Sequence, residues 1–199
     1  MGKEVSSKSL LIVSGCSHSN VDLPIYGREG ITAWPKLVAD ELDMNLLCLG
    51  RAYADNDYIA NVVMDAVLDH SNITVMVLWT DSARWPAVQE KFREDPLTYN
   101  LRCMWRLNYF LRQQEVPFFQ AATSCPTAGL DPQPSNEDIF KNRYFSKDYF
   151  TTQAPTDNMI WMDNKELTIL NDSHPNQKGH DWIAETFLLQ YYSAEFVYD

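Results

Sequence analysis

Near its start the chain runs through Leu10-Leu11-Ile12-Val13-Ser14-Gly15-Cys16-Ser17-His18-Ser19, passing directly from aliphatic side chains into a polar turn. A short apolar run that ends at a turn predicts a buried β-strand over residues 9–14. The turn places Ser17 just beyond the end of this strand. Ser17 is therefore a candidate nucleophile, although a serine at this point also commonly caps the following turn.

The rest of the chain alternates short apolar runs with helical patterns. Further strands are predicted at 44–49, 73–79, 116–121 and 159–162, and helices at 32–42, 58–68, 97–114 and 176–192. Strands that alternate with amphipathic helices form a parallel sheet between two helical layers. The sequence thus predicts a three-layer α/β/α sandwich.

Length and composition favour a single domain. The 199 residues are 45% hydrophobic, which suits one compact core over residues 1–199. The helical and strand patterns fade at 123–157, where prolines and aromatic residues cluster. We expect an insertion there that partly covers a site.

The charge of the chain bears on its partners and location. A formal net charge of -11 argues against binding to nucleic acid or anionic membranes. No apolar run is long enough to span a bilayer, and the first residues carry no signal-peptide pattern. None of the four cysteines lies in a C-x-x-C pair. We expect a cytoplasmic protein with reduced cysteines.

A second polar segment, Asn171-Asp172-Ser173-His174-Pro175-Asn176, precedes the last predicted helix. It supplies an acid and a histidine on one loop, with Pro175 suited to the first turn of the helix. Ser17, His174 and Asp172 together provide the nucleophile, the base and the orienting acid of a serine hydrolase.

Polar residues also follow the second and third predicted strands, at 51–57 and 80–84. Ligands bind beyond the carboxyl ends of the strands in parallel sheets. We therefore expect Ser17, Asn56 and Asp81 to lie near one another.

These motifs together resemble the SGNH (GDSL-type) hydrolase superfamily. Gly15-Cys16-Ser17 is similar to its Gly-Asp-Ser motif, and Asp172-Ser173-His174-Pro175 to its last block. Segments 49–56 and 77–82 resemble the two oxyanion blocks between them. The resemblance implies a flavodoxin-like sheet and a serine esterase without a cofactor. Similar proteins are expected in tailed phages and marine bacteria.

Two departures from the family concern the oxyanion hole. Tyr53 or Ala54 stands where the second block has glycine, and Asp81 stands where the third block has asparagine. An ionised carboxylate cannot donate a hydrogen bond to an oxyanion. The expected oxyanion and substrate-binding residues are Ala54, Asn56, Asp81, His18 and Arg84.

Several of these residues have a structural alternative. Cys16 is a rival nucleophile that we expect to point away from the site. Asn56 could cap its helix instead of donating to the oxyanion. Asp81 and Arg84 could form a solvated ion pair. The acid of the last block is Asp172 or, with a longer spacing, Asn171.

Three functions compete at this point. The first is an esterase or deacetylase acting on a small-molecule or carbohydrate acyl ester such as an O-acetyl sugar, with an acyltransferase as a variant. The second is a catalytically degenerate binding module, such as part of a phage particle. The third is a metal-dependent phosphoesterase, for which the spacings match no dedicated metal motif and whose ligands would be Asp55, Asp57, Asp81, His174 and His180.

Overall fold

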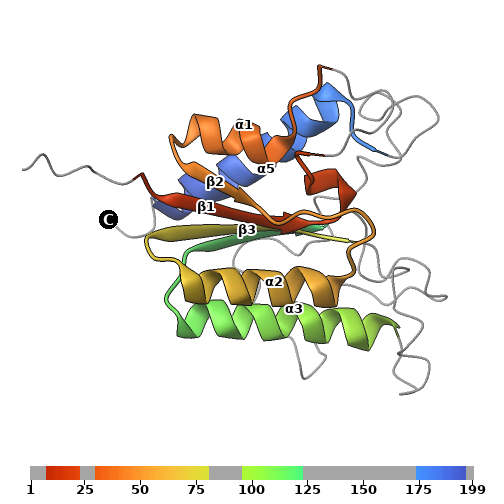
Figure 1. Cartoon of the computed structure of the whole chain (residues 1–199), viewed down its shortest axis with the longest axis vertical. Helices are drawn as coiled ribbons and strands as arrows, with labels where there is room; N and C mark the ends of the chain where they lie inside the picture. Colours follow the sequence, from red (N-terminus) through yellow and green to blue (C-terminus); the bar gives the residue numbers. More distant parts are fainter. Residues whose placement is uncertain (1–7, 23–29, 81–95, 123–173, 196–199) are drawn as a thin grey trace, which may run out of the picture.

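A computed structural model describes residues 8–22, 30–80, 96–122 and 174–195. Its centre is a parallel sheet in the order β2-β1-β3-β4 (Figure 1). The strands are β1 (Leu10–Gly15), β2 (Asn45–Cys48), β3 (Ile73–Trp79) and β4 (Phe118–Ala122). The central pair, β1 and β3, is in register from Leu10 opposite Ile73 to Gly15 opposite Leu78.

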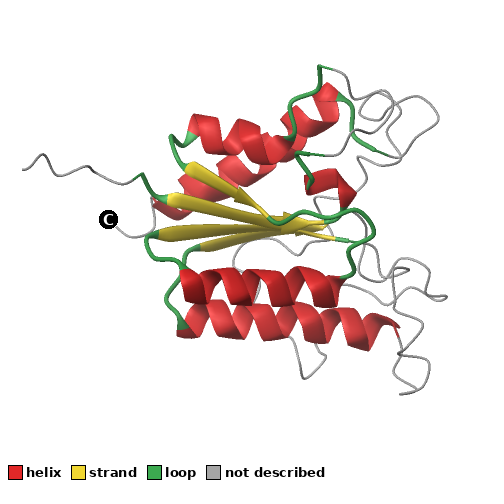
Figure 2. Ribbon diagram, viewed as in Figure 1, coloured by secondary structure: helices red, strands yellow, loops and turns green. Residues whose placement is uncertain are grey.

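Helices cover both faces of the sheet, which confirms the predicted three-layer α/β/α class (Figure 2). On one face lie α1 (Trp34–Glu41) and α5 (Gln177–Glu195), and on the other lie α2 (Asn56–Asp69) and α3 (Pro96–Gln113). A single 3-10 turn, η1 (Ser17–Ser19), follows β1.

The two central strands face both helical layers, so their side chains alternate between two cores. Ile12, Val75 and Val77 pack under α2 and α3, whereas Leu11, Val13 and Met76 pack under α1 and α5. All seven residues of β3 are buried, which explains why its sequence is apolar without alternation. Trp34 stacks on Phe187 at 4.5 Å between ring centroids and joins α1 to α5.

The predicted elements in the described part of the chain all form, with β3 at its predicted ends and the ends of the others shifted by at most three residues. The start of α2 shows why ends are hard to predict. It begins at Asn56 instead of 58 because the Asp55 carboxylate accepts a hydrogen bond from the Tyr58 N–H, at 2.7 Å. The predicted strand at 159–162 and insertion at 123–157 lie outside the described residues.

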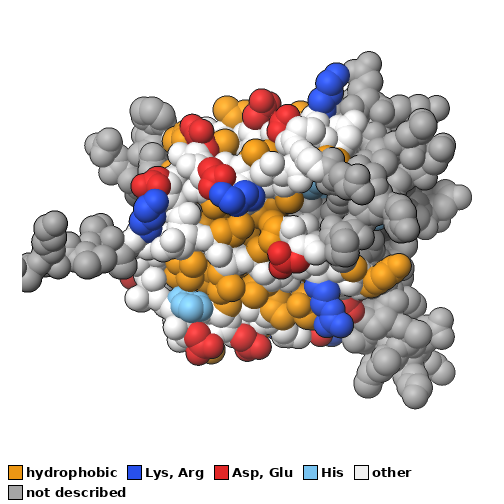
Figure 3. All heavy atoms as spheres, turned by 45° about the horizontal axis from the view of Figure 1, so that its top comes forward, with side chains coloured by type: hydrophobic (Ala, Val, Ile, Leu, Met, Phe, Trp, Pro, Cys, Tyr) orange, Lys and Arg blue, Asp and Glu red, His pale blue; other side chains and the backbone are white. Residues whose placement is uncertain are grey.

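The face in Figure 3 shows acidic and basic side chains interspersed among the described residues. Two ion pairs, Lys8 with Asp43 and Lys36 with Asp40, join exposed side chains. Exposed pairs of this kind contribute little to stability. No helix of the described residues is both long enough and apolar enough to cross a membrane.

Candidate active site

The turn after β1 is built around Gly15. A Cβ at Gly15 would lie 2.2 Å from the Ser19 Oγ and 2.8 Å from the Leu78 carbonyl oxygen, so a larger residue does not fit. The Ser19 N–H donates to the Cys16 carbonyl at 2.9 Å and closes η1. This tight turn fixes Ser17 beyond the carboxyl end of β1, where its side chain is 5% exposed.

Ser17 meets a histidine from the other end of the chain. The His174 Nε2 lies 2.9 Å from the Ser17 Oγ, although 157 positions separate the two residues. His174 is half-buried and comes three residues before α5 begins at Gln177. This distance is that of a hydrogen bond between a nucleophile and its general base.

A second histidine packs against the first. The rings of His18 and His174 are 5.0 Å apart between centroids and meet edge to face at 71°. On its other side the His18 Nδ1 is 3.3 Å from the Cys16 Sγ, and both residues are buried. Cys16 is 0% exposed and its sulfur lies against His18, whereas the Ser17 Oγ lies against His174.

The loop from Gly50 to Asn56 lies against this turn. A Cβ at Gly50 would come within 2.7 Å of the Ser19 carbonyl group, and the Arg51 N–H donates to the Gly15 carbonyl at 3.1 Å. The Ala54 N–H, expected to face an oxyanion, donates instead to the Arg51 carbonyl at 3.2 Å. Between them Tyr53 has a φ of 62°, the left-handed region that a turn of this type requires.

Asn56 is occupied by structural contacts. Its Nδ2 donates to the Thr80 carbonyl at 3.1 Å and to the Asn100 Oδ1 at 2.5 Å, and its Oδ1 accepts from the Thr80 N–H at 3.0 Å. All three residues are buried. Asn56 therefore links the end of β3 to the starts of α2 and α3, while its neighbour Asp55 is the residue that caps α2.

Three of the predicted site residues, Asp172, Asp81 and Arg84, lie outside the described residues. Among those described, the structure brings together Ser17, His18 and His174. Asn56 contacts Thr80, the residue before position 81, and the expected proximity of Ser17, Asn56 and Asp81 stays a prediction.

The described residues contain no group of three or more His, Cys, Asp or Glu side chains arranged to hold a metal ion. Three of the candidate metal ligands that lie in the described residues make other contacts. Asp55 caps α2, Asp57 pairs with Arg106 at 2.8 Å, and the buried His180 accepts from the Trp34 N–H through its Nδ1 at 3.2 Å. His180 thus joins α5 to α1.

Two other cysteines, Cys48 and Cys103, have thiols whose pKa values are raised by burial. Burial raises the pKa of Cys103 to about 12, with a further rise from the negative charge of Asp57. Burial also raises the pKa of Cys48. Both side chains are therefore neutral thiols at pH 7, and a thiol is a far weaker nucleophile than a thiolate.

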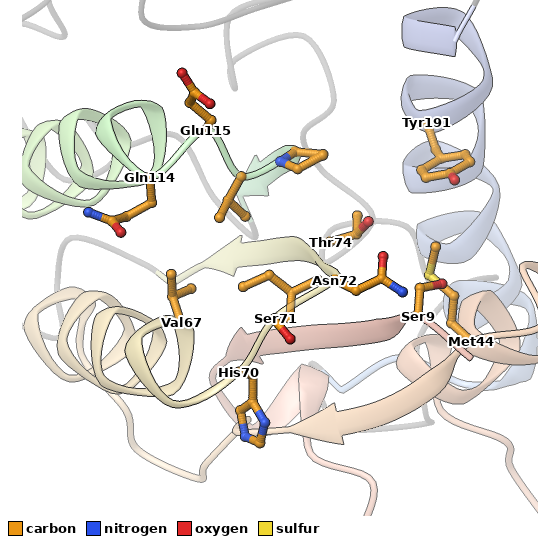
Figure 4. Close-up of a pocket in the computed structure, with 13 residues that line it drawn as sticks. Ser9, Met44, Val67, His70, Ser71, Asn72, Thr74, Gln114, Glu115 and Tyr191 are labelled. Atoms are coloured by element: carbon orange, nitrogen blue, oxygen red, sulfur yellow. The ribbon is translucent and has the colours of Figure 1, made fainter. Parts of the chain in front are cut away.

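A hollow of about 480 Å³ lies at the opposite end of the sheet (Figure 4). Its lining comes from residues at the starts of the strands, including Ser9, Thr74 and Val116, and from His70 and Tyr191. Neither Ser17 nor His174 borders it. The hollow and the candidate site therefore occupy different ends of the same strands.

The fold is similar to those of two solved structures. A lipolytic protein of the G-D-S-L family from Desulfitobacterium hafniense aligns over 89% of this chain and 97% of its own, with a TM-score of 0.56 and 12% identity. The psychrotrophic esterase EstA from a Pseudoalteromonas species aligns over 91% of this chain and 95% of its own, with a TM-score of 0.57 and 14% identity.

The chain has the GDSL-type (SGNH) hydrolase fold. No family model matches the sequence, and no curated protein matches it either. The GDSL-type likeness is thus one of fold, at low sequence identity. The expected similarity to proteins of phages and marine bacteria stays a prediction.

Three features of the site in this GDSL-type fold were not predicted from the sequence. These are the ring contact of His18 with His174, the bonds from Asn56 to Thr80 and Asn100, and the backbone conformation of Tyr53. The first two join residues distant in the chain, for which one sequence carries no signal. The third had a signal, because the sequence shows a bulky residue where the resembled family has glycine.

Proposed function

We propose that the protein is a serine esterase that uses Ser17 as nucleophile and His174 as general base. The observation that carries the proposal is the 2.9 Å separation of the Ser17 Oγ and the His174 Nε2. Ser17 lies at the carboxyl edge of a parallel sheet, where such folds bind ligands. The GDSL-type fold of two lipolytic neighbours supports a hydrolase of this class.

In the proposed reaction, His174 accepts the hydroxyl proton of Ser17 while the Oγ attacks the acyl carbonyl. The bond from the carbonyl carbon to the alkoxy oxygen then breaks, and His174 returns the proton to the leaving alcohol. Water, deprotonated by the same histidine, hydrolyses the acyl-enzyme and frees Ser17. Asp172 is proposed to hold the His174 ring in the required tautomer from its Nδ1 side.

The oxyanion that forms in each step needs hydrogen-bond donors. The backbone N–H of Ser17 is proposed as the first donor, and the loop from Arg51 to Asn56 closes one side of the site. Asp81 and Arg84 are proposed to contact substrate from the segment after β3. His18, packed against His174, is proposed to hold the ring of the base in place.

One observation favours a second candidate function. The Ala54 N–H and the Asn56 amide are both engaged within the protein, so neither is available to an oxyanion without rearrangement. A chain with too few donors would keep the fold and bind ligands without cleaving them. This second candidate is a catalytically degenerate binding module.

Hydrolysis of p-nitrophenyl acetate distinguishes the two candidates. We expect turnover by the wild type and a loss of roughly a thousandfold or more in Ser17→Ala. Ser193→Ala is the matched control, because Ser193 is an exposed serine near the end of α5, two residues after Tyr191, which borders the hollow at the opposite end of the sheet. Absence of turnover in the folded wild type would favour the binding module.

A further inference from the structure

Tyr53 combines two unfavourable features. Its backbone has a φ of 62°, and its side chain is 91% exposed. A bulky residue in the left-handed region costs free energy that glycine or asparagine would avoid. The exposed ring recovers none of that cost by burial in the core. Strained backbone of this kind tends to persist at functional sites.

The loop that carries Tyr53 is fixed to the candidate active site at both ends. On one side the Arg51 N–H donates to the Gly15 carbonyl, and Gly50 packs against Ser19. On the other side Asn56 holds Thr80. Figure 1 places this loop and η1, which contains Ser17, at the same end of the sheet. Tyr53 therefore projects from the rim of the site.

The residues on either side of Tyr53 are held by contacts within the protein. Ala54 is 4% exposed and bonded to Arg51 across the turn, and the Arg51 guanidinium lies 5.4 Å from the centre of the Tyr58 ring. A tyrosine has two side-chain torsions, so little conformational entropy is lost when its ring contacts a ligand. The ring is thus available as a flat surface on a fixed support.

We propose that Tyr53 determines specificity by stacking on the C–H face of a sugar ring that carries the ester. This inference rests on the proposed esterase function and names its substrate class, a neutral O-acylated carbohydrate. A sugar has an apolar face and a polar edge, which suits one exposed aromatic ring on a loop that also contains the polar residues Arg51 and Asp55. A long acyl chain would need a continuous apolar lining instead. Most other exposed large apolar side chains of the described residues lie on helices: Leu68, Tyr109, Leu189 and Tyr192.

The test compares an acetylated xylo-oligosaccharide with p-nitrophenyl acetate as substrates. In Tyr53→Gly we expect the ratio of kcat/KM for the sugar ester to that for the small ester to fall about tenfold, through a higher KM for the sugar. Tyr53→Phe keeps the ring and should keep the ratio. The melting temperature of Tyr53→Gly should be equal to or above that of the wild type, because glycine relieves the left-handed backbone.

Tyr109→Ala is the matched control, since it removes another exposed tyrosine from α3 and should leave the ratio unchanged. An unchanged ratio in Tyr53→Gly would overturn the proposal. So would an equal loss with both substrates, because that would be a general defect of the site.

A binding measurement separates failure of this inference from failure of the esterase function. Xylotetraose, which has no ester, is titrated calorimetrically into Ser17→Ala and into Ser17→Ala/Tyr53→Gly. Binding that weakens about tenfold without the ring supports the stacking role even when the wild type hydrolyses neither ester. Absence of xylotetraose binding to Ser17→Ala would overturn it, whether or not esters are cleaved.

Discussion

The two ends of the sheet differ in kind, although the same strands form both. At the carboxyl end, Ser17 lies within hydrogen-bond distance of His174. At the amino end lies a hollow of about 480 Å³ lined largely by residues of turns and strand starts. The hollow offers space, whereas the carboxyl end holds the proposed nucleophile and base. The comparison teaches that the side-chain geometry for the proposed chemistry lies beyond the carboxyl ends of the strands, where parallel sheets bind ligands, and not at the hollow.

The local structure of the amino end has a simpler explanation. Asp43, Asn72 and Glu115 all have positive φ values there, of 51°, 53° and 55°. Each follows the end of a helix, where a left-handed residue reverses the chain. Their conformations therefore belong to the turns that connect helices to strands, in contrast to Tyr53 at the carboxyl end.

Substitution of one histidine at each end of the sheet should give the largest difference in esterase activity. We expect His174→Gln to lower esterase kcat/KM by about 10²- to 10⁴-fold, because Ser17 then lacks a base. His70→Gln changes the histidine that borders the amino-end hollow and should leave kcat/KM within about twofold. Equal losses of kcat/KM in the two variants, measured with p-nitrophenyl acetate, would contradict the assignment of the esterase site to the carboxyl end of the sheet.

Loss of the Asn56 contacts should mainly affect stability. Asn56→Ala leaves the buried Thr80 N–H and Asn100 side chain without this partner, at a cost of about 1–3 kcal/mol in the free energy of unfolding. Asn61→Ala is the control, since the Asn61 side chain is exposed and its amide donates to the carboxylate of Asp57 in the same helix. Urea denaturation of both variants would refute the account if their midpoints coincided.

The smallest effect is a pH dependence of stability at alkaline pH. The pKa of Cys103 is raised by burial from 9.0 to about 12, so the folded state retains the proton after the unfolded state has lost it. Stability from this group is fully present below pH 9 and declines as pH rises toward 12. Cys103→Ala should flatten this part of the curve of unfolding free energy against pH. Burial also raises the pKa of Tyr99, so a residual slope is expected in the variant.

The sequence predicted the elements of the fold because each has its own periodic pattern. β3 was predicted with its observed ends, because a run of seven residues that is apolar apart from Thr74 is bounded by polar ones. The pair of Ser17 and His174 was also predicted, from two short motifs at the ends of the chain. The sequence left open whether Tyr53 or Ala54 stands where the resembled family has glycine. The positive φ of Tyr53 favours Tyr53. The partners of Asn56 depend on tertiary packing of β3 and α3, which no local pattern encodes.

Covalent labelling of Ser17 tests the central claim most directly. The folded protein is treated with a fluorophosphonate, and the adduct is measured by intact mass and located by peptide mapping. The account predicts one adduct on Ser17 in the wild type, none in Ser17→Ala and much slower labelling in His174→Gln. A folded wild type that gains no adduct, or an adduct that persists in Ser17→Ala, would contradict it.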